Sequence, residues 1–132
     1  MLDAGPVIAL LHEADHDHDL ALRGFRQLRA ARARLLAPLP IVFEVFKWLL
    51  GEGGPHAARR GLQHMLTVMD VVFLEPAHLE SVSRIAASMP NWSGTLEDAT
   101  VVTVAEARRL PVWTLNYRDL SAFPNLQFWT PG

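Results

Sequence analysis

The sequence contains no cysteine and a single lysine, and both shortages exclude classes of function. Without cysteine, the chain cannot form a disulfide framework, a Cys-ligated zinc site or a thiol nucleophile. The one lysine, Lys47, lies between Phe46 and Trp48, so the Gly-Lys-Ser/Thr phosphate loop of ATPases and GTPases is excluded. The lack of disulfides is compatible with a reducing compartment, and we expect a cytoplasmic protein.

Long apolar runs and an excess of charge are missing as well. No uninterrupted apolar stretch approaches the roughly 18 residues that a membrane span needs. The first residues carry an acid, Asp3, where a signal peptide would carry basic residues. With 12 Lys/Arg against 14 Asp/Glu, the formal charge of −2 excludes a globally basic nucleic-acid coat protein. We therefore expect a soluble protein without a membrane partner.

The 132 residues suffice for one domain, and half of them are hydrophobic. Segments with helical spacing alternate with short β-branched and aromatic runs, which is typical of a parallel sheet covered by helices. The pattern predicts short strands at 35–37, 71–74, 111–114 and 126–129, with another before Asp3. It predicts helices over 6–11, 19–32, 41–50, 55–69, 76–89 and 96–109. Asp19 is expected to cap its helix, and Gly51, Gly53 and Gly54 to end theirs.

In a parallel sheet, ligands bind at the carboxyl ends of the strands, so polar residues there are the candidates for chemistry. These residues are Asp3, Asp98, Asn116 and Asp119. Each also has an ordinary structural explanation, because acids favour helix N-termini and turns. Glu44 is harder to explain, since apolar residues flank it on both sides, and a buried carboxylate needs a partner. The alternative is an amphipathic helix that shows this one acid to solvent.

Two further polar segments are suggestive but have simpler explanations. The run from His12 to Asp19 contains several metal-ligand residue types, yet it lacks a fixed ligand spacing and is better interpreted as a solvated loop. Arginines recur every three residues at Arg23, Arg26, Arg29 and Arg32, and a solvated helix face explains them better than a phosphate track.

The carboxyl-terminal third resembles the hallmark of PIN-domain ribonucleases. In that family an Asp opens a helix of small and branched residues, as in Leu96–Ala105, and a strand then ends in a Thr-x-Asn/Asp-x-x-Asp motif, as in Thr114–Asp119. Leu2-Asp3-Ala4 is similar to the family's first-strand motif, and Phe43-Glu44-Val45 to its Glu motif. The motifs occur in the family's order over nearly the whole chain. Length and single-domain form are most similar to VapC-type toxins of toxin–antitoxin pairs.

The sequence departs from that family at two places. Only Met1 and Leu2 precede Asp3, whereas the family's first strand usually has a few more residues, so we expect either a clipped first strand or a true start that lies upstream. Leu120 stands where the family usually has Phe, with Phe123 close by.

The resemblance implies an α/β fold over residues 1–132, namely a three-layer α/β/α sandwich around a mainly parallel sheet of about four to five strands. It implies that Asp3, Glu44, Asp98 and Asp119 are catalytic and bind metal, with Asn116 as a further metal ligand. Thr114, Asn116 and Arg118 would orient these groups or contact substrate. Clustered carboxylates repel one another unless a cation neutralises them, and hard oxygen ligands favour Mg²⁺ or Mn²⁺.

The activity so implied is metal-dependent hydrolysis of phosphodiester bonds in a structured RNA, such as a transfer or ribosomal RNA. An antitoxin protein and a second copy of the chain are the implied partners. Trp48, Leu49 and Leu50 are candidates for an interface, with ordinary core packing as the alternative. A PIN-like binding module without turnover and a metal-dependent DNA nuclease or phosphatase remain alternative functions.

Overall fold

Two short parallel strands, β1 (Leu36–Pro38) and β2 (Asp70–Val72), lie at the centre of the computed structural model, which describes residues 1–132. Leu36 pairs with Asp70 and Pro38 with Val72. All three residues of β1 are buried, as expected for a parallel strand covered on both faces.

Hydrogen bonds extend this parallel arrangement into three segments that are too short to count as strands. The backbone N–H of Leu2 donates to the carbonyl of Leu36 at 2.8 Å, and Leu2 also forms a parallel bridge with Trp113. Val112 in turn forms a parallel bridge with Phe128. The N-terminal segment therefore lies between β1 and Trp113.

The prediction of about four to five strands is confirmed only in part. The α/β class and the parallel direction are correct, but the sheet has two strands, and the segments at 1–3, 111–114 and 126–129 form only isolated bridges.

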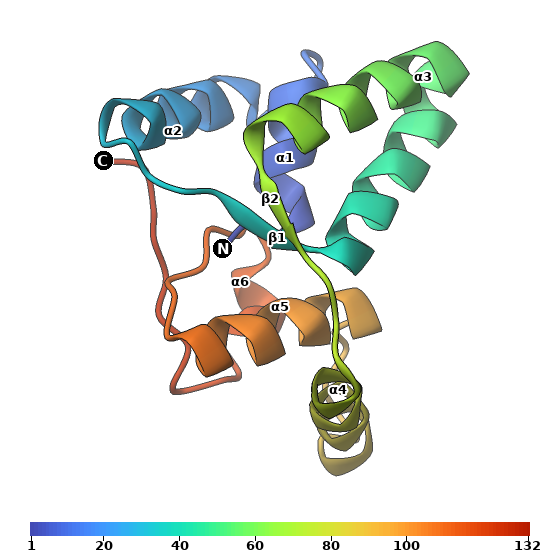
Figure 1. The fold of residues 1–132 in the computed structure, drawn as a ribbon, viewed down its shortest axis with the longest axis vertical. Coiled ribbons are helices and arrows are strands. Elements are labelled where there is room, and N and C mark those ends of the chain that lie inside the picture. The colour runs from blue at the N-terminus through green and yellow to red at the C-terminus, as the bar shows by residue number, and fades with distance from the viewer.

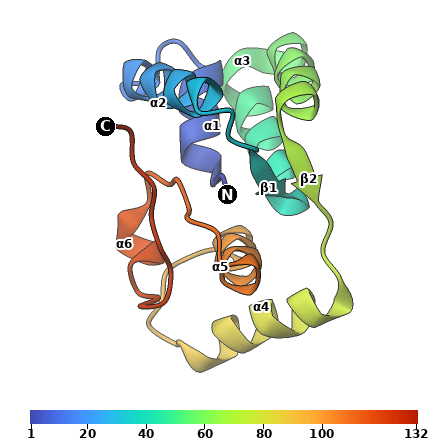
Figure 2. The same ribbon diagram turned by 60° about the vertical axis from the view of Figure 1, so that its left-hand side comes forward.

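Helices lie on both sides of the strands (Figures 1 and 2). On one side are α1 (Ala4–Leu11), α2 (His18–Ala30) and α3 (Leu39–Val68). On the other side are α5 (Leu96–Arg108) and, outside it, α4 (Pro76–Ser88). Every residue of α5 from Asp98 to Ala105 is buried, and this segment consists mainly of small and β-branched residues. None of these helices is both long and apolar enough to cross a membrane.

The two helices predicted at 41–50 and 55–69 are the two arms of α3, which meet at a kink. Gly51 and Gly53 do not end the first arm, and the only non-helical residue is Gly54, with φ 82° and ψ 178°. That positive φ is accessible to glycine at little cost, and Pro55 then starts the second arm with the backbone angle a helix needs. The kink therefore comes from the Gly-Pro pair alone.

One smaller prediction is wrong, and one helix was not predicted. Asp19 does not cap α2, because the helix begins at His18 and Asp17 occupies the N-cap position. The helix without a prediction is α6 (Tyr117–Leu120), a single turn that contains Asp119 and is capped by the side chain of Asn116.

Aromatic rings join α2 to the end of the chain. The Trp113 ring lies 4.8 Å from Phe25 and 5.0 Å from Trp129, measured between centroids. Gly24 faces the same indole, and a Cβ there would lie 2.3 Å from the Trp113 ring. The absence of a side chain at this position allows α2 to pack against the central segments.

We expect Gly24→Ala to lower the free energy of unfolding by about 1–3 kcal/mol, because the new methyl group must displace a buried indole. Gly51→Ala is the matched control, since a Cβ there meets nothing within 4 Å and alanine favours a helix by up to about 1 kcal/mol. Urea denaturation of both variants measures the difference. Equal stability changes in the two variants would contradict this packing.

Candidate metal and active site

Asp3 lies where the N-terminal segment passes into α1, next to the bridged segment that contains Trp113. Its side chain is 3% exposed, and its Oδ1 accepts a hydrogen bond from the N–H of Ala4 at 2.8 Å. Its Oδ2 accepts one from the hydroxyl of Thr114 at 2.7 Å. Burial raises the pKa of Asp3, the two hydrogen bonds oppose that rise, and the negative charge of Asp98 adds to it.

Asp98 is held at the start of α5 by a reciprocal cap. Its Oδ2 accepts a hydrogen bond from the N–H of Thr95 at 2.9 Å, and its own N–H donates to Thr95 Oγ1 at 3.2 Å. The helix-capping explanation considered from the sequence is therefore correct, but the cap uses only one carboxylate oxygen. The residue is buried and acts electrostatically on both Asp3 and Glu44, so it also belongs to the acidic cluster.

Glu44 reaches this cluster from the first arm of α3. Its Oε2 is buried and has no hydrogen-bond partner. Burial, followed by the negative charges of Asp3, Asp98 and Glu97, raises the pKa of Glu44 to about 7. The alternative in which Glu44 is shown to solvent is wrong for this oxygen.

Three carboxylates from different parts of the chain therefore act on one another, and no cationic group is among the causes that shift the pKa of Asp3 or of Glu44. The acids are Asp3, Glu44 and Asp98. An unpartnered buried oxygen among like charges is costly, and a multivalent cation removes that cost. Because all the donors are hard oxygens, the residues fit Mg²⁺ or Mn²⁺.

Asp119 is predicted as the fourth ligand, but its carboxylate already has other partners. Its Oδ1 accepts from the Ser93 hydroxyl at 2.7 Å, and its Oδ2 accepts from Asn116 Nδ2 at 2.9 Å and from Arg118 at 3.3 Å. The hydrogen bonds from Ser93 and Asn116, followed by Arg118, lower the pKa of Asp119. It does not contribute to the raised pKa of Glu44. Its role as a ligand stays a prediction.

A short chain of hydrogen bonds connects Asp3 with Asp119. The Thr114 hydroxyl donates to Asp3 and accepts from the N–H of Asn116 at 2.8 Å. The Asn116 side chain then donates to Asp119. Thr114 and Asn116 therefore hold the two acids relative to each other, as expected for residues that orient ligands.

The sequence analysis assigned no role in the site to the loop between α4 and α5. Its Trp92 donates from Nε1 to the backbone carbonyl of Asp119 at 2.8 Å, and its Ser93 binds the carboxylate. Glu97 was missed as well, although its place beside Asp98 in the sequence was a usable signal. Nothing in the sequence indicates the Ser93 contact, which joins residues 26 positions apart.

The other segments singled out in the sequence lie outside this cluster. Asp15, His16 and Asp17 have ligand atoms within 4.8 Å of one another in the loop before α2, where His16 is exposed. The loop prediction is confirmed, and Asp15 accepts from the N–H of Asp17 as in an ordinary turn.

The arginines of α2 and the apolar end of the first α3 arm also lie outside the acidic cluster. Arg23, Arg26, Arg29 and Arg32 are all exposed. Leu49 is buried in the core and Trp48 packs against that core, which leaves Leu50, 43% exposed, as the apolar candidate for an interface.

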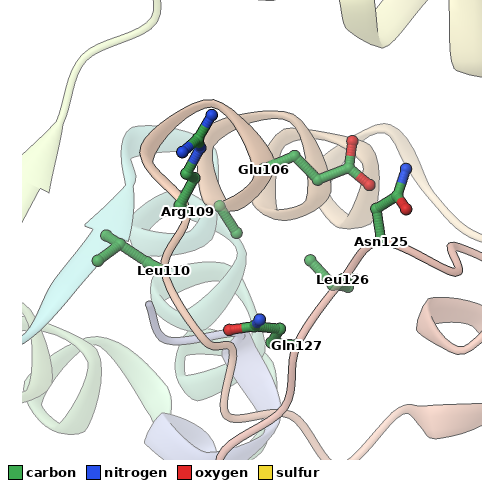
Figure 3. A pocket seen from close by; sticks show the side chains of 7 residues that line it. Glu106, Arg109, Leu110, Asn125, Leu126 and Gln127 are labelled. Carbon is green, nitrogen blue, oxygen red and sulfur yellow. The ribbon is translucent and has the colours of Figure 1, made fainter.

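A pocket of about 490 Å³ lies at the opposite end of α5 from Asp98 (Figure 3). Glu106 and Arg109 line it on the helix side, with Asn125 and Gln127 on the facing segment. It contains none of the clustered acids, so we do not assign it to their chemistry.

No protein-family model matches the sequence, and no curated protein is similar to it. Solved structures are similar in fold. VapC20 of Mycobacterium tuberculosis, described as a sarcin-ricin loop cleaving toxin, matches with a TM-score of 0.78 at 18% identity over 92% of each chain. Matches to VapBC2 of Rickettsia felis bound to promoter DNA and to VapBC-1 of nontypeable Haemophilus influenzae have TM-scores of 0.76 and 0.72, at 11% and 15% identity. Each covers 98% of this chain and 96% of the other. The chain therefore shares the fold of these VapC structures, which confirms the α/β class that the resemblance to PIN domains implies.

We expect the metal-free protein to lose stability as the pH rises from about 4.5, the ordinary pKa of Glu44, to about 7, its pKa in the fold. Between these values the folded state binds more protons than the unfolded state, so the free energy of unfolding falls with pH and levels off above about 7. Glu44→Gln removes this contribution and should raise the melting temperature at pH 8 in EDTA. The pKa of Asp3 is also raised, so in both the wild type and Glu44→Gln this residue adds a further decrease of the free energy of unfolding with rising pH.

The control for this measurement is Glu52→Gln, which changes an exposed acid on the same helix. It should leave the wild-type pH profile intact. If the melting temperatures of Glu44→Gln and the wild type changed with pH in the same way, the pKa of Glu44 would not be raised in the fold.

Proposed function

With the VapC fold as the premise, we propose that the protein is a metal-dependent endoribonuclease of the VapC toxin kind. The observation that carries the proposal is the unpartnered, buried Oε2 of Glu44 among the carboxylates of Asp3 and Asp98. Such a cluster lowers the stability of the metal-free fold. Clustered carboxylates of this kind are expected where a protein binds a metal ion for phosphodiester hydrolysis.

Asp3, Glu44 and Asp98 would hold a Mg²⁺ or Mn²⁺ ion, with Asp119 and Asn116 as further ligands. When bound, such an ion supplies Lewis-acid stabilisation of phosphate charge and lowers the pKa of water. The reaction is hydrolysis, in which a water oxygen forms a new bond to phosphorus, the bond to the leaving ribose oxygen breaks, and that oxygen takes up a proton.

The remaining residues of the site orient the acids and the substrate. Thr114 fixes one oxygen of Asp3, and Thr95 fixes one oxygen of Asp98, so each acid keeps one oxygen in a defined direction. Arg118 has a side chain that is 81% exposed and lies 3.3 Å from Asp119. Its guanidinium is placed to contact a phosphate that approaches the acids.

Structured RNA is the substrate that we propose. One structural neighbour is described as a toxin that cleaves the sarcin-ricin loop, and this favours a ribosomal or transfer RNA here. The cleavage position in this chain's target is left to experiment.

An antitoxin protein and a second copy of the chain are the proposed partners. Two of the neighbours are VapBC complexes. Phe43 beside Glu44 is 63% exposed, and Leu96, two residues before Asp98, is 59% exposed. Apolar side chains that flank an acidic site suit a protein segment that covers it.

We also propose a larger sheet and a cellular location for the protein. One is that the bridged segments at 1–3, 111–114 and 126–129 belong to a mainly parallel sheet of about four to five strands in a three-layer sandwich, which is supported by their parallel bridges. The other is a cytoplasmic location, which the lack of cysteine favours.

We expect Asp98→Asn to reduce RNA cleavage by about 100-fold or more while the protein stays folded. The amide oxygen of asparagine can still accept the hydrogen bond from Thr95, so the helix cap survives and only the charge is lost. The measurement is cleavage of a total small-RNA pool with Mn²⁺ or Mg²⁺, beside an EDTA control, and the fold is checked by circular dichroism.

Glu106→Gln is the matched control, because it changes an exposed acid on the same helix at the far end. It should cleave like the wild type. Full activity of Asp98→Asn, or cleavage that survives EDTA, would rule out the proposed site. Metal-dependent cutting of DNA or of small phosphate esters in preference to RNA would reassign the substrate. A folded protein that binds Mn²⁺ but cleaves nothing would favour a binding module.

A further inference from the structure

A second pocket opens beside the acidic site, between the end of α4, the loop that follows it and α6. Its volume is about 510 Å³. We call it the Trp92 pocket, and the lining residues that matter here are Met89, Asn91, Trp92, Arg118, Asp119 and Ala122. Because Asp119 lines it, the Trp92 pocket is continuous with the site that would bind metal and phosphate.

The indole of Trp92 is fixed in place by three contacts. Its Nε1 donates to the Asp119 carbonyl at 2.8 Å, and its ring packs edge-to-face on Phe123 with 5.3 Å between centroids. Gly94 lies so close that a Cβ there would be 2.1 Å from the ring. The aromatic wall of the pocket is therefore formed before any ligand arrives, which lowers the entropic cost of binding.

The pocket combines flat apolar surface with a few polar groups. Met89, Trp92 and Ala122 supply apolar surface, and the amide of Asn91 supplies one donor and one acceptor group. A nucleobase has the matching chemistry, with apolar faces and hydrogen-bonding edges. Unpaired bases of RNA characteristically stack on aromatic side chains and on arginine while their edges are hydrogen-bonded.

The position of the cationic side chain in the pocket indicates on which side a phosphate would bind. Arg118 is the one cationic side chain that lines the Trp92 pocket, and its guanidinium contacts Asp119 on the side of the acids. Because Arg118 and Asp119 both line the Trp92 pocket, a phosphate that contacts Arg118 would lie at its edge. The pocket of Figure 3 has no such arrangement, because it lacks an aromatic side chain and lies at the other end of α5.

We propose that the Trp92 pocket binds one unpaired nucleobase of the RNA, next to the phosphate that is cleaved. The inference rests on the proposed ribonuclease function and names a specificity subsite for it. A pocket of this volume accommodates a nucleotide.

The experiment is a titration of the full chain with the 5′-monophosphates of adenosine, cytidine, guanosine and uridine in Mg²⁺, followed by NMR of the indole N–H groups. Trp92→Phe assigns the Trp92 resonance among the four tryptophans. We expect this resonance to shift saturably with at least one nucleotide. Asn91→Ala should weaken that binding about 5- to 10-fold, because it removes the hydrogen bonds to the base edge.

Asn125→Ala, in the pocket of Figure 3, is the matched control and should leave the titration unchanged. No shift with any nucleotide, or an equal effect of both alanine variants, would overturn the proposal. An identical shift with inorganic phosphate alone would overturn it too, since it would indicate a phosphate site without base recognition.

Cleavage of a random-sequence RNA separates this proposal from the one on which it rests. If the wild type cleaves, Asn91→Ala should relax the base preference at one position beside the cut, and an unchanged preference would contradict the subsite. If the wild type binds nucleotides but cleaves no RNA, the base-binding pocket stands and the ribonuclease proposal falls.

Discussion

The arrangement of the whole molecule depends on the two-residue segment in front of α1. Leu2 is hydrogen-bonded to Leu36 on one side and bridged to Trp113 on the other, so it joins the two halves of the chain at the centre of the fold. The next residue, Asp3, caps α1 and accepts the hydrogen bond of Thr114. Leu2 therefore holds the central segments together, and the adjacent Asp3 supplies a carboxylate of the candidate site. The backbone pairing of this segment fixes where that carboxylate lies.

The acidic cluster illustrates how a fold can store an unfavourable interaction at a site of function. Burial and mutual repulsion raise the pKa of Glu44 to about 7, and its Oε2 has no partner. Around it, Thr95 and Thr114 hold the neighbouring acids by hydrogen bonds from the protein itself. The surrounding core of α5 and the first arm of α3 keeps these groups together despite their repulsion.

Much of this architecture is visible in the sequence, and the failures have physical causes. Helical periodicity predicts α4 and α5 almost to the residue, and the apolar neighbours of Glu44 indicate its burial. A run such as 126–129 forms only an isolated bridge, and its composition cannot show this, because a strand has the same composition whether it forms one bridge or a full ladder. Gly51 and Gly53 are exposed helix residues, and propensity alone cannot separate them from Gly54, whose φ is positive. The partners of Asp119 come from a loop distant in sequence, for which local patterns give no signal.

The pairing of Leu2 with Trp113 also determines when the molecule can assemble during its own synthesis. These residues are separated by 111 positions, so the central segment can pair with Leu36 early but with Trp113 only after most of the chain has left the ribosome. The backbone hydrogen bonds within a helix such as α2 are local and can form earlier. Because Thr114 is needed to orient Asp3, a translation product that stops short of it would carry three of the acids without the geometry that joins them.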